Sequence, residues 1–400
     1  MKPKIRFSSS NILYEEKTLS EISTINPKTN VPLEFEYVDL ESVSGTEMTN
    51  HRTEHKATAP SRAQRLAKKG DIFYQTVRPY QKNNYYFDMD DDNYVFSTGY
   101  AQIRPSIYGK YLFTLLQNDS FLKQVLDNCA GTSFPAINPS VLSRLSVRIC
   151  KDKQEQQAIA SYFTSLDSQI SASTSRLASL KQMKAASLQA MFPQEGETVP
   201  KIRFKGFEGE WKKVKLNSFA KRVTRKNSHL ESTLALTIAS AHGLVSQIDY
   251  FNNLVVGSNI RNYYLLKKGE FAYNKSYSNG YPFGSVKRLE RYEQGILSTL
   301  YITFSIDNSI SSDYLTHFFD TNLWHKEVAE RAAEGARNHG LLNIGANDFL
   351  DINIWKPESK SEQQAIASYF TSLDRQISLQ SQRLEKLKQI KSACLDKMFV

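Results

Sequence analysis

The 400-residue sequence contains little that would support a disulfide framework or a metal site. Its three cysteines, Cys129, Cys150 and Cys394, are odd in number and show neither a Cys-x-x-Cys pair nor the cysteine and histidine spacing of zinc sites. We interpret them as reduced packing residues. No run approaches the apolar length of a membrane-spanning helix, about 18 residues, and the opening MKPKIRFSSS lacks the apolar stretch of a secretory signal. We therefore expect a cytoplasmic protein with no membrane partner.

Motifs typical of catalysis and nucleotide binding are also missing. The sequence has no Gly-x-Gly-x-x-Gly or P-loop pattern to cradle a phosphate and no Gly-x-Ser-x-Gly nucleophile turn. His51 and His55 have helical spacing, yet their polar, threonine-rich surroundings favour a solvated loop over a metal site. Glu-x-Lys triplets, which some nucleases use, start at three unrelated places, Glu15, Glu54 and Glu210. We expect no catalytic residue, no metal site and no cofactor bound by this chain.

What the sequence does contain is an internal repeat. The string QQAIASYFTSLD occupies residues 156–167 and again 363–374. Other matches keep the same order in both halves. They are PKIRF at 3–7 and 200–204, KKGD and KKGE at 68–71 and 267–270, STGYAQI and STLYITF at 97–103 and 298–304, and LKQMKAASLQAMF and LKQIKSACLDKMF at 180–192 and 387–399. Single residues also correspond, Tyr14 to Trp211, Leu19 to Leu216, Leu142 to Phe349 and Val147 to Ile354. The chain therefore has two copies of one plan, a variable domain followed by a helix.

The repeated segment has the period of a long amphipathic helix. From Glu155 and from Glu362 onward, one stripe recurs at alternating spacings of four and three residues, and no proline or glycine interrupts it. About 38 residues at 1.5 Å each make a rod roughly 57 Å long. We expect the two rods to pair antiparallel, the alternative being that each packs only on its own domain. The apolar seam residues are Ile159, Phe163, Leu166, Ile170, Leu177 and Leu180, and Ile366, Phe370, Leu373, Ile377, Leu384 and Leu387.

The variable regions favour a mixed fold. Residues 76–100 and 271–304 are rich in Tyr, Phe, Val and Thr and are broken by Asn, Gly and Pro, which is typical of short strands and turns. Each is followed by a helical stretch, at 108–128 and 311–333. We predict an α+β protein in which two pseudo-symmetric mixed α/β domains are separated by two long antiparallel coiled-coil helices. The predicted segments are domain 1 (1–150), helix 1 (151–193), domain 2 (194–357) and helix 2 (358–400).

This organisation resembles the specificity subunit of type I restriction-modification systems. The resemblance rests on the duplicated EQQAIASYFTSLD helices, on the KKGD/E turn before a strand, and on Gly131 and Gly335, which precede the run leading to each helix. It implies two target recognition domains, each reading one half of a bipartite double-stranded DNA sequence, and helices that set the half-site spacing. It further implies two methyltransferase subunits docked on the helices, and restriction subunits recruited through that complex. S-adenosylmethionine, ATP and Mg²⁺ are then expected on those partner subunits.

DNA contacts are expected where polar and basic residues gather in turn-rich stretches. The net charge of +10 allows an anionic partner, and residues 201–357 carry 21 Lys+Arg against 15 Asp+Glu. Arg suits guanine edges, Asn suits adenine edges, and Lys suits phosphates. The alternative is that the Asn-Gly-Tyr loop after KKGE is only a hairpin turn. The predicted contacts are Arg78, Lys82, Asn83, Asn84 and Arg104 in the first domain, and Asn274, Lys275, Ser276, Tyr277, Asn279, Arg337, Asn338 and His339 in the second.

Two other functions stay open on the sequence alone. One is a fused or stand-alone restriction enzyme, which the missing motifs disfavour. The other is a coiled-coil scaffold that does not bind DNA. Binding to DNA at low salt separates the scaffold from the specificity subunit.

The missing motifs generate a first prediction. The purified chain, incubated with DNA, Mg²⁺ and S-adenosylmethionine, should neither transfer a methyl group nor cut the DNA. Radiolabelled methyl transfer and gel analysis of a plasmid would measure the two activities. Methyl transfer by a preparation free of other subunits would contradict the non-catalytic interpretation.

Overall fold

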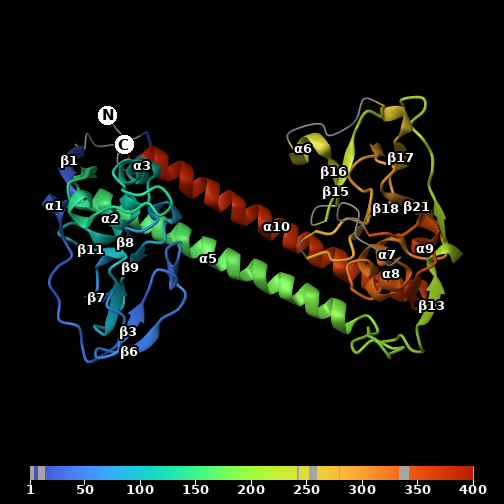
Figure 1. The fold of residues 1–400 in the computed structure, drawn as a ribbon, viewed down its shortest axis with the longest axis horizontal. Coiled ribbons are helices and arrows are strands. Elements are labelled where there is room, and N and C mark those ends of the chain that lie inside the picture. Colours follow the sequence, from blue (N-terminus) through green and yellow to red (C-terminus); the bar gives the residue numbers. More distant parts are fainter. Residues whose placement is uncertain are drawn as a thin grey trace. The chain divides into compact units, whose positions relative to one another are not determined.

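The computed structural model describes residues 4–7, 14–240, 243–251, 259–278, 280–332 and 342–399. The chain divides into two compact units. Unit 1 contains residues 1–175 and 381–400, and unit 2 contains residues 176–380. Each unit therefore combines one variable domain with part of both long helices (Figure 1).

The two long helices form as their period predicts. Helix α5 spans Lys153–Ala190 and helix α10 spans Lys360–Met398, each as one uninterrupted element. Both begin close to the repeated glutamate, and α5 ends shortly before Pro193, a residue that cannot continue a helix. The first half of α5 and the second half of α10 belong to unit 1, and the remaining halves belong to unit 2.

Unit 1 contains two four-stranded sheets, a two-stranded ladder and a two-stranded hairpin. One sheet has the order β2 (Ser23–Ile25), β11 (Tyr100–Pro105), β8 (Ile72–Gln75), β9 (Tyr85–Tyr86). The other has the order β6 (Arg52–His55), β3 (Glu34–Val38), β10 (Tyr94–Ser97), β7 (Ala63–Leu66). The ladder pairs β1 (Tyr14–Thr18) with β12 (Ser146–Cys150), and β4 (Val43–Ser44) forms a small hairpin with β5 (Glu47–Met48). The short helices are α1 (Leu19–Ile22), α2 (Gly109–Leu116), α3 (Asp119–Asp127), α4 (Pro139–Leu142) and the 3-10 turn η1 (Pro79–Gln81).

Unit 2 repeats much of this plan. Its four-stranded sheet has the order β14 (Ala220–Arg222), β21 (Ile302–Ile306), β18 (Phe271–Asn274), β19 (Ser285–Arg288). Three two-stranded ladders pair β13 (Lys212–Lys215) with β22 (Asn353–Lys356), β15 (Leu236–Ala239) with β16 (Gly243–Ser246), and β17 (Tyr264–Lys267) with β20 (Gln294–Leu297). The short helices are α6 (Gln247–Phe251), α7 (Ser312–Phe318), α8 (His325–Arg331), α9 (Ala346–Leu350) and the turns η2 (Leu216–Ser218) and η3 (Ile260–Asn262).

Strand pairing agrees between the units down to the register. In unit 1, Lys17 of β1 lies opposite Val147 of β12, and in unit 2, Val214 of β13 lies opposite Ile354 of β22. The sheets β2-β11-β8-β9 and β14-β21-β18-β19 have the same order. The two-copy plan and the α+β class read from the sequence are therefore confirmed. The units differ mainly outside this shared sheet, where unit 1 has a second four-stranded sheet and unit 2 has separate ladders.

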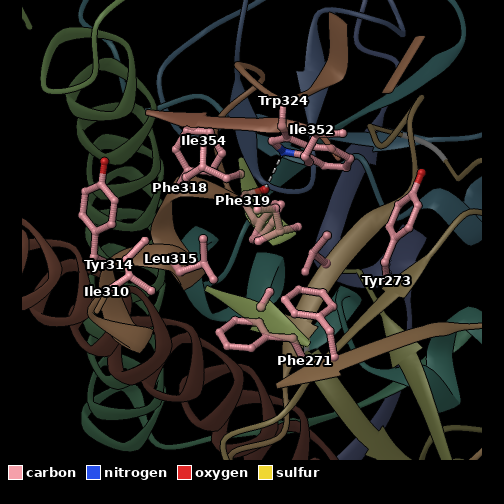
Figure 2. Packing of buried hydrophobic residues seen from close by; sticks show 14 of the residues in the cluster. Phe271, Tyr273, Ile310, Tyr314, Leu315, Phe318, Phe319, Trp324, Ile352 and Ile354 are labelled. Carbon is pink, nitrogen blue, oxygen red and sulfur yellow. Dashed lines mark hydrogen bonds between the residues drawn. The ribbon is translucent and has the colours of Figure 1, made fainter. Parts of the chain in front are cut away.

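Aromatic side chains dominate the core of unit 2 (Figure 2). Tyr273 of β18 stacks on Phe349 with ring centroids 4.2 Å apart. The buried Trp324 donates its indole N–H to the Phe319 carbonyl at 3.2 Å, so the polar atom of this large side chain is satisfied. The core thus joins the sheet to the helices that follow it.

The seam of the long helices is part of these cores. In unit 1, Phe163 of α5 and Met398 of α10 belong to the same buried cluster as the strands and helices of the first domain. In unit 2, Phe370 of α10 and Phe192, just after α5, belong to the cluster of the second domain. Both proposed packing modes therefore occur together, because each stripe contacts its own domain and the other long helix. None of the twelve predicted seam residues is exposed: Ile159, Phe163, Leu166, Ile170, Leu177, Leu180, Ile366, Phe370, Leu373, Ile377, Leu384 and Leu387.

Within unit 1 the long helices run antiparallel. Tyr162 of α5 lies 3.5 Å from the Cys394 Sγ atom of α10, and Asp167, further along α5, pairs with Lys391, an earlier residue of α10, at 2.5 Å. The chain direction of one helix is therefore opposite to that of the other.

Unit 2 repeats these contacts with the two helices exchanged. Tyr369 of α10 lies 2.9 Å from the Ser187 hydroxyl of α5, and Asp374 pairs with Lys184 at 2.7 Å. These four residues occupy the same repeat positions as those of unit 1. The duplicated sequence thus makes a duplicated set of contacts.

The PKIRF repeat packs on the duplicated tyrosine. The ring of Phe7 contacts Tyr162 with centroids 5.5 Å apart, and the ring of Phe204 contacts Tyr369 at 6.1 Å. Both pairs are edge-to-face, a favourable arrangement for aromatic rings. The repeat therefore has a structural use in each unit.

One ion-pair network distinguishes unit 2 from unit 1. Lys184 contacts Asp320 at 2.9 Å as well as Asp374, and Lys287 contacts Asp320 at 3.1 Å. Burial alone would raise the pKa of the Asp320 carboxyl, but the ammonium groups of Lys287 and Lys184 outweigh it and hold that pKa well below its usual range. In the described part of unit 1, no second carboxylate lies within ion-pair distance of Lys391.

We predict that Asp320→Asn destabilises unit 2 by about 2–3 kcal/mol near pH 7, because it removes the counter-charge of Lys287 and one of the two counter-charges of Lys184, whose side chains are both only 18% exposed. A depressed carboxyl pKa stabilises the fold above the unfolded-state value of about 4, and this contribution is lost as the pH falls through the folded-state pKa. The difference between wild type and variant should therefore shrink in acid. Urea unfolding at several pH values measures it.

The matched control for this variant is Asp167→Asn in unit 1. The Asp167 side chain is 32% exposed and has a single lysine partner, so we expect a loss of about 1 kcal/mol or less. If both variants lose the same free energy of unfolding, the Asp320 network stabilises unit 2 no more than the single ion pair stabilises unit 1.

Candidate nucleic-acid interface

In unit 1, the candidate interface is the loop that follows β8, together with residues 130–137. Val77 forms a β-bridge with Ala136, and the backbone N–H of Ile137 donates to the Thr76 carbonyl at 3.0 Å. The N–H of Arg78 donates to the Pro135 carbonyl at 2.8 Å. These bonds attach the two segments to each other at three successive residues of the loop.

Side-chain amides stiffen the same loop from within. Gln75, which is buried, donates its side-chain amide to Gln81 at 2.8 Å and accepts the backbone N–H of Asn83 at 3.1 Å. The Asn84 side chain accepts the N–H of Gln75 at 2.8 Å. The loop is therefore held in one shape by hydrogen bonds, and its outward side chains start from defined backbone positions.

Among the predicted contacts of unit 1, Arg78 is the one whose charged group has no internal polar partner in the part of the chain that the structure describes. Its backbone is left-handed, with φ 54° and ψ 53°, a conformation that costs a non-glycine residue on the order of 1–3 kcal/mol. Its guanidinium lies over the ring of Phe134, 4.6 Å from the centroid. Among the residues that the structure describes, no acceptor forms a hydrogen bond or ion pair with this guanidinium.

Lys82 and Asn83 are partly committed within the domain. Lys82 is also left-handed, and its ammonium donates to the Gln117 carbonyl at 3.1 Å and pairs with Asp119. The side-chain oxygen of Asn83 accepts the N–H of Gly45 at 2.9 Å, which leaves its amide N–H₂ group for an outside acceptor. Both residues remain predicted contacts that no observation tests.

Asn84 and Arg104 do not fit the expectation of DNA contacts. Asn84 is buried, and besides Gln75 it contacts Gln117, to which its amide donates at 3.3 Å. Arg104 forms two 2.8 Å hydrogen bonds with the buried carboxylate of Asp71, the acid of the KKGD turn. Asn84 lies in the interior, and Arg104, although its side chain is 32% exposed, uses its Nε and Nη2 atoms on Asp71, so we remove both from the candidate interface.

The KKGE turn of unit 2 has the same internal use. The Glu270 carboxylate accepts two hydrogen bonds from Arg225, at 2.7 and 2.9 Å, and also the backbone N–H of Lys267 at 2.7 Å. In both units, therefore, the acid after the turn glycine is a structural anchor for the strand that carries the candidate loop.

In unit 2 the candidate loop follows β18, the counterpart of β8. Asn274 accepts the backbone N–H of Ser276 at 3.0 Å, which shapes the turn. The Lys275 carbonyl accepts the N–H of Leu342 at 2.9 Å, and its ammonium donates to the Ile344 carbonyl at 3.4 Å. Tyr277 is 57% exposed. The loop after the sheet strand is thus attached to the segment before α9, as in unit 1.

Four of the predicted contacts lie outside the described residues. They are Asn279, Arg337, Asn338 and His339. Within the described part of the loop, Gly284 has φ 78°, and a Cβ atom at this position would lie 2.0 Å from the Asn274 carbonyl oxygen. Only glycine fits there, so the chain can return to β19 close beside β18.

A cleft of about 770 Å³ opens beside the loop of unit 1. Its lining includes Arg52, Arg62 and Arg78. Arg52 is committed to Asp39 and Glu54, both at 2.8 Å. Burial would raise the pKa of the Asp39 carboxyl, but the hydrogen bonds from Arg52 and Ser42 outweigh it and keep that pKa below its usual value. In the described residues Arg62 and Arg78 form no ion pair, which leaves two arginines of the cleft available to an anion.

The structure also shows exposed aromatic residues that the sequence analysis did not select. Phe134 is 62% exposed and Tyr80 is 51% exposed, both beside Arg78. Single exposed apolar side chains are common on protein surfaces, so what distinguishes Phe134 is its contact with the Arg78 guanidinium. Phe134 could have been found from its place after Gly131, in the stretch that corresponds to the segment of Arg337.

A group of His317, Asp320 and Asp374 in unit 2 brings three potential metal ligands within 4.8 Å. Lys184 and Lys287 already contact the two carboxylates, and a divalent cation would have to displace these ammonium groups. We therefore interpret the group as the ion-pair network described above. None of the described helices is both long and apolar enough to cross a membrane.

Comparison with known proteins points to one system. Residues 11–182 match the family model described as the type I restriction modification DNA specificity domain. A segment of the chain is 34% identical over 139 residues to the type I restriction enzyme HindI specificity subunit of Haemophilus influenzae. That match covers 33% of this chain and 30% of the relative, so it spans about a third of each protein.

Solved structures share the fold over nearly the whole chain. The type I restriction-modification S subunit from M. genitalium superposes with a TM-score of 0.67 at 14% identity and covers 100% of this chain and 99% of that one. A chain from a type I R-M system studied for its complex assembly and conformational transition gives a TM-score of 0.54 at 17% identity, over 97% and 98%. Residues 11–182 therefore resemble the type I restriction modification DNA specificity domain, and the chain as a whole shares its fold with these two solved structures.

Proposed function

We propose that the chain is the DNA sequence-specificity subunit of a type I restriction-modification complex, and that each unit reads one half of a bipartite target. The observation that carries this proposal is the equivalent placement of the two candidate loops. Each follows the corresponding strand of an equally ordered sheet, β8 or β18, and is attached to the segment before the last strand. The loops themselves differ in sequence, as two half-sites of different sequence require.

The duplicated helices support a second part of the proposal, the docking of two methyltransferase subunits. Within the duplicated string QQAIASYFTSLD, four residues are identical and exposed in both copies, so burial in a core does not account for them. Of these, Thr371 also contacts the His317 Nε2 atom at 3.1 Å. Internal packing explains why the buried stripe is the same in both helices, but it does not explain the identical exposed residues. An identical exposed face on each helix is suited to binding two copies of one partner. In unit 2 this face lines a groove of about 370 Å³. The residues are Gln157, Ser161, Thr164 and Ser165, and their counterparts Gln364, Ser368, Thr371 and Ser372.

The remaining partners follow from this assignment. Restriction subunits would join through the methyltransferase complex, and S-adenosylmethionine, ATP and Mg²⁺ would bind to the partner subunits. The chain itself would recognise DNA without catalysing a reaction. We also propose a cytoplasmic location, because a restriction system meets its DNA there.

The first test exchanges one domain. Replacing residues 205–350 by the matching region of a relative with a different target should change one half of the methylated sequence and leave the other half intact. The physical reason is that each candidate loop is anchored entirely within its own unit. Genome-wide mapping of methylated sites, in cells that also express the methyltransferase subunit, measures both halves. A simultaneous change in both halves would contradict independent reading.

The second test concerns the spacing of the half-sites. One extra heptad in each long helix, inserted after Arg176 and after Arg383, keeps the apolar stripe in phase and lengthens each helix by about 10 Å. Because the DNA rises about 3.4 Å per base pair, we expect the preferred spacer to grow by roughly one to three base pairs with some loss of affinity. Methylation mapping reads out the spacer.

A three-residue insertion at the same places is the control for the heptad variant. It shifts the stripe out of phase and should prevent assembly. An unchanged spacer with full activity in the heptad variant would show that the helices dock subunits without measuring distance.

A further inference from the structure

We propose that Phe134 and Arg78 form one guanine-reading element, in which the phenyl ring holds the guanidinium in the plane from which it donates two hydrogen bonds to a base edge. This inference rests on the proposed function and extends it. It assigns the reading of one base pair to two residues that lie far apart in the sequence. Phe134 is then a positioning residue that acts through Arg78.

The first argument comes from the side chains. The guanidinium carbon of Arg78 lies 4.6 Å from the centroid of Phe134, within the range of a cation–π contact. The ring is 62% exposed, so the pair lies at the surface of the domain. A stacked guanidinium loses rotational freedom but keeps its N–H donors, because the contact uses its face and leaves its edge free.

The second argument comes from the backbone. Arg78 has a left-handed conformation beside Pro79, and its N–H is bound to the Pro135 carbonyl, next to Phe134. Gly131 has φ 87°, and a Cβ atom there would lie 3.2 Å from the Phe134 carbonyl oxygen, so the turn that presents the ring favours glycine. Both partners therefore start from fixed backbone positions, and the strain at Arg78 is maintained by the surrounding bonds.

The third argument comes from a comparison within the same unit. Arg52 lies over the ring of Tyr37 at 4.8 Å, which is nearly the same contact. Its guanidinium, however, donates to Asp39 and Glu54, each at 2.8 Å. Arg52 is thus a structural pair with its donors used. The Arg78 donors have no acceptor among the described residues, so they are available to an acceptor from outside the chain.

The chemistry of the acceptor follows from the shape of the donor. A guanidinium fork held in one plane matches the O6 and N7 atoms of guanine, which lie side by side on the major-groove edge. A phosphate would also accept the same fork, but phosphates are present along the whole duplex and carry no sequence information, whereas a fork held in one orientation can discriminate between base edges. The aromatic support therefore favours a base edge over the backbone of the DNA.

The experiment uses the complex of the full chain with its methyltransferase subunits and a DNA pool randomised in both half-sites. Sequencing of the bound fraction gives the preference at every base pair. Arg78→Ala should lower the preference for guanine at one position of one half-site by about five- to 150-fold, the range of a good bidentate contact. Arg78→Lys should lose most of it too, because an ammonium lacks the planar fork.

Phe134→Leu should reduce the preference at the same position by about two- to fivefold, because it removes a surface cation–π contact but keeps an apolar side chain. Phe134→Tyr should retain the preference, since the ring is kept. In the Arg78→Ala background, Phe134→Leu should cause no further change there. Arg52→Lys is the matched control, and we expect it to leave every base preference intact.

The proposal is overturned if Phe134→Leu weakens binding to all sequences equally, if its effect persists without Arg78, or if the affected position does not favour guanine. Unfolding midpoints of all variants should stay within a few degrees of wild type. The proposal is also overturned if Phe134→Leu unfolds the protein and Arg78→Lys retains the guanine preference, because Phe134 would then be a folding residue and the planar fork would not be needed. A wild-type complex with no preference at any position would instead reject the proposed function itself.

Discussion

The fold depends on the burial of one apolar stripe along each long helix. A helix of this length cannot bury such a stripe on its own, and most of its stability must come from packing against other elements. In each unit the stripe is covered by the other long helix and by the core of the domain, through residues such as Phe163 and Phe370. Segments from the two halves of the chain are consequently needed to complete either unit.

This requirement explains why the two copies are closely similar along the long helices and differ in the variable domains. The seam and the PKIRF segment have the same internal partners in both units. The acid of the KKGD/E turn accepts the backbone N–H of the first turn lysine in both units, although its arginine partner differs, Arg104 in unit 1 and Arg225 in unit 2.

The ion pairs beside the seam differ more between the two units than the seam itself does. Unit 2 ties Lys184 to Asp320 and Lys287, whereas the pair of Lys391 and Asp167 in unit 1 lacks that extension.

The candidate loop of unit 1 combines rigidity with the uncommitted guanidinium of Arg78, which is what sequence-specific reading needs. In both units the backbone of the loop is hydrogen-bonded to the segment before the last strand. The residues that point outward therefore have less conformational freedom than residues of an unattached loop. A donor that is held in place before binding loses less entropy when it meets its acceptor. The left-handed backbone of Arg78 is the local cost of this arrangement.

The sequence by itself determined the two-copy plan, the α+β class and the long helices, because periodicity and repeated turns are local signals that survive without knowledge of the fold. It also directed attention to the loop after each KKGD/E strand. Which residues of these loops are free was decided only by tertiary structure. Asn84 and Arg104 look like DNA contacts in the sequence, but Gln75 and the buried Asp71 bind them internally. The contact between Phe134 and Arg78 could not be predicted from the sequence. The two residues meet only because residues 130–137 fold back on the loop after β8, and no local sequence pattern indicates such a long-range contact.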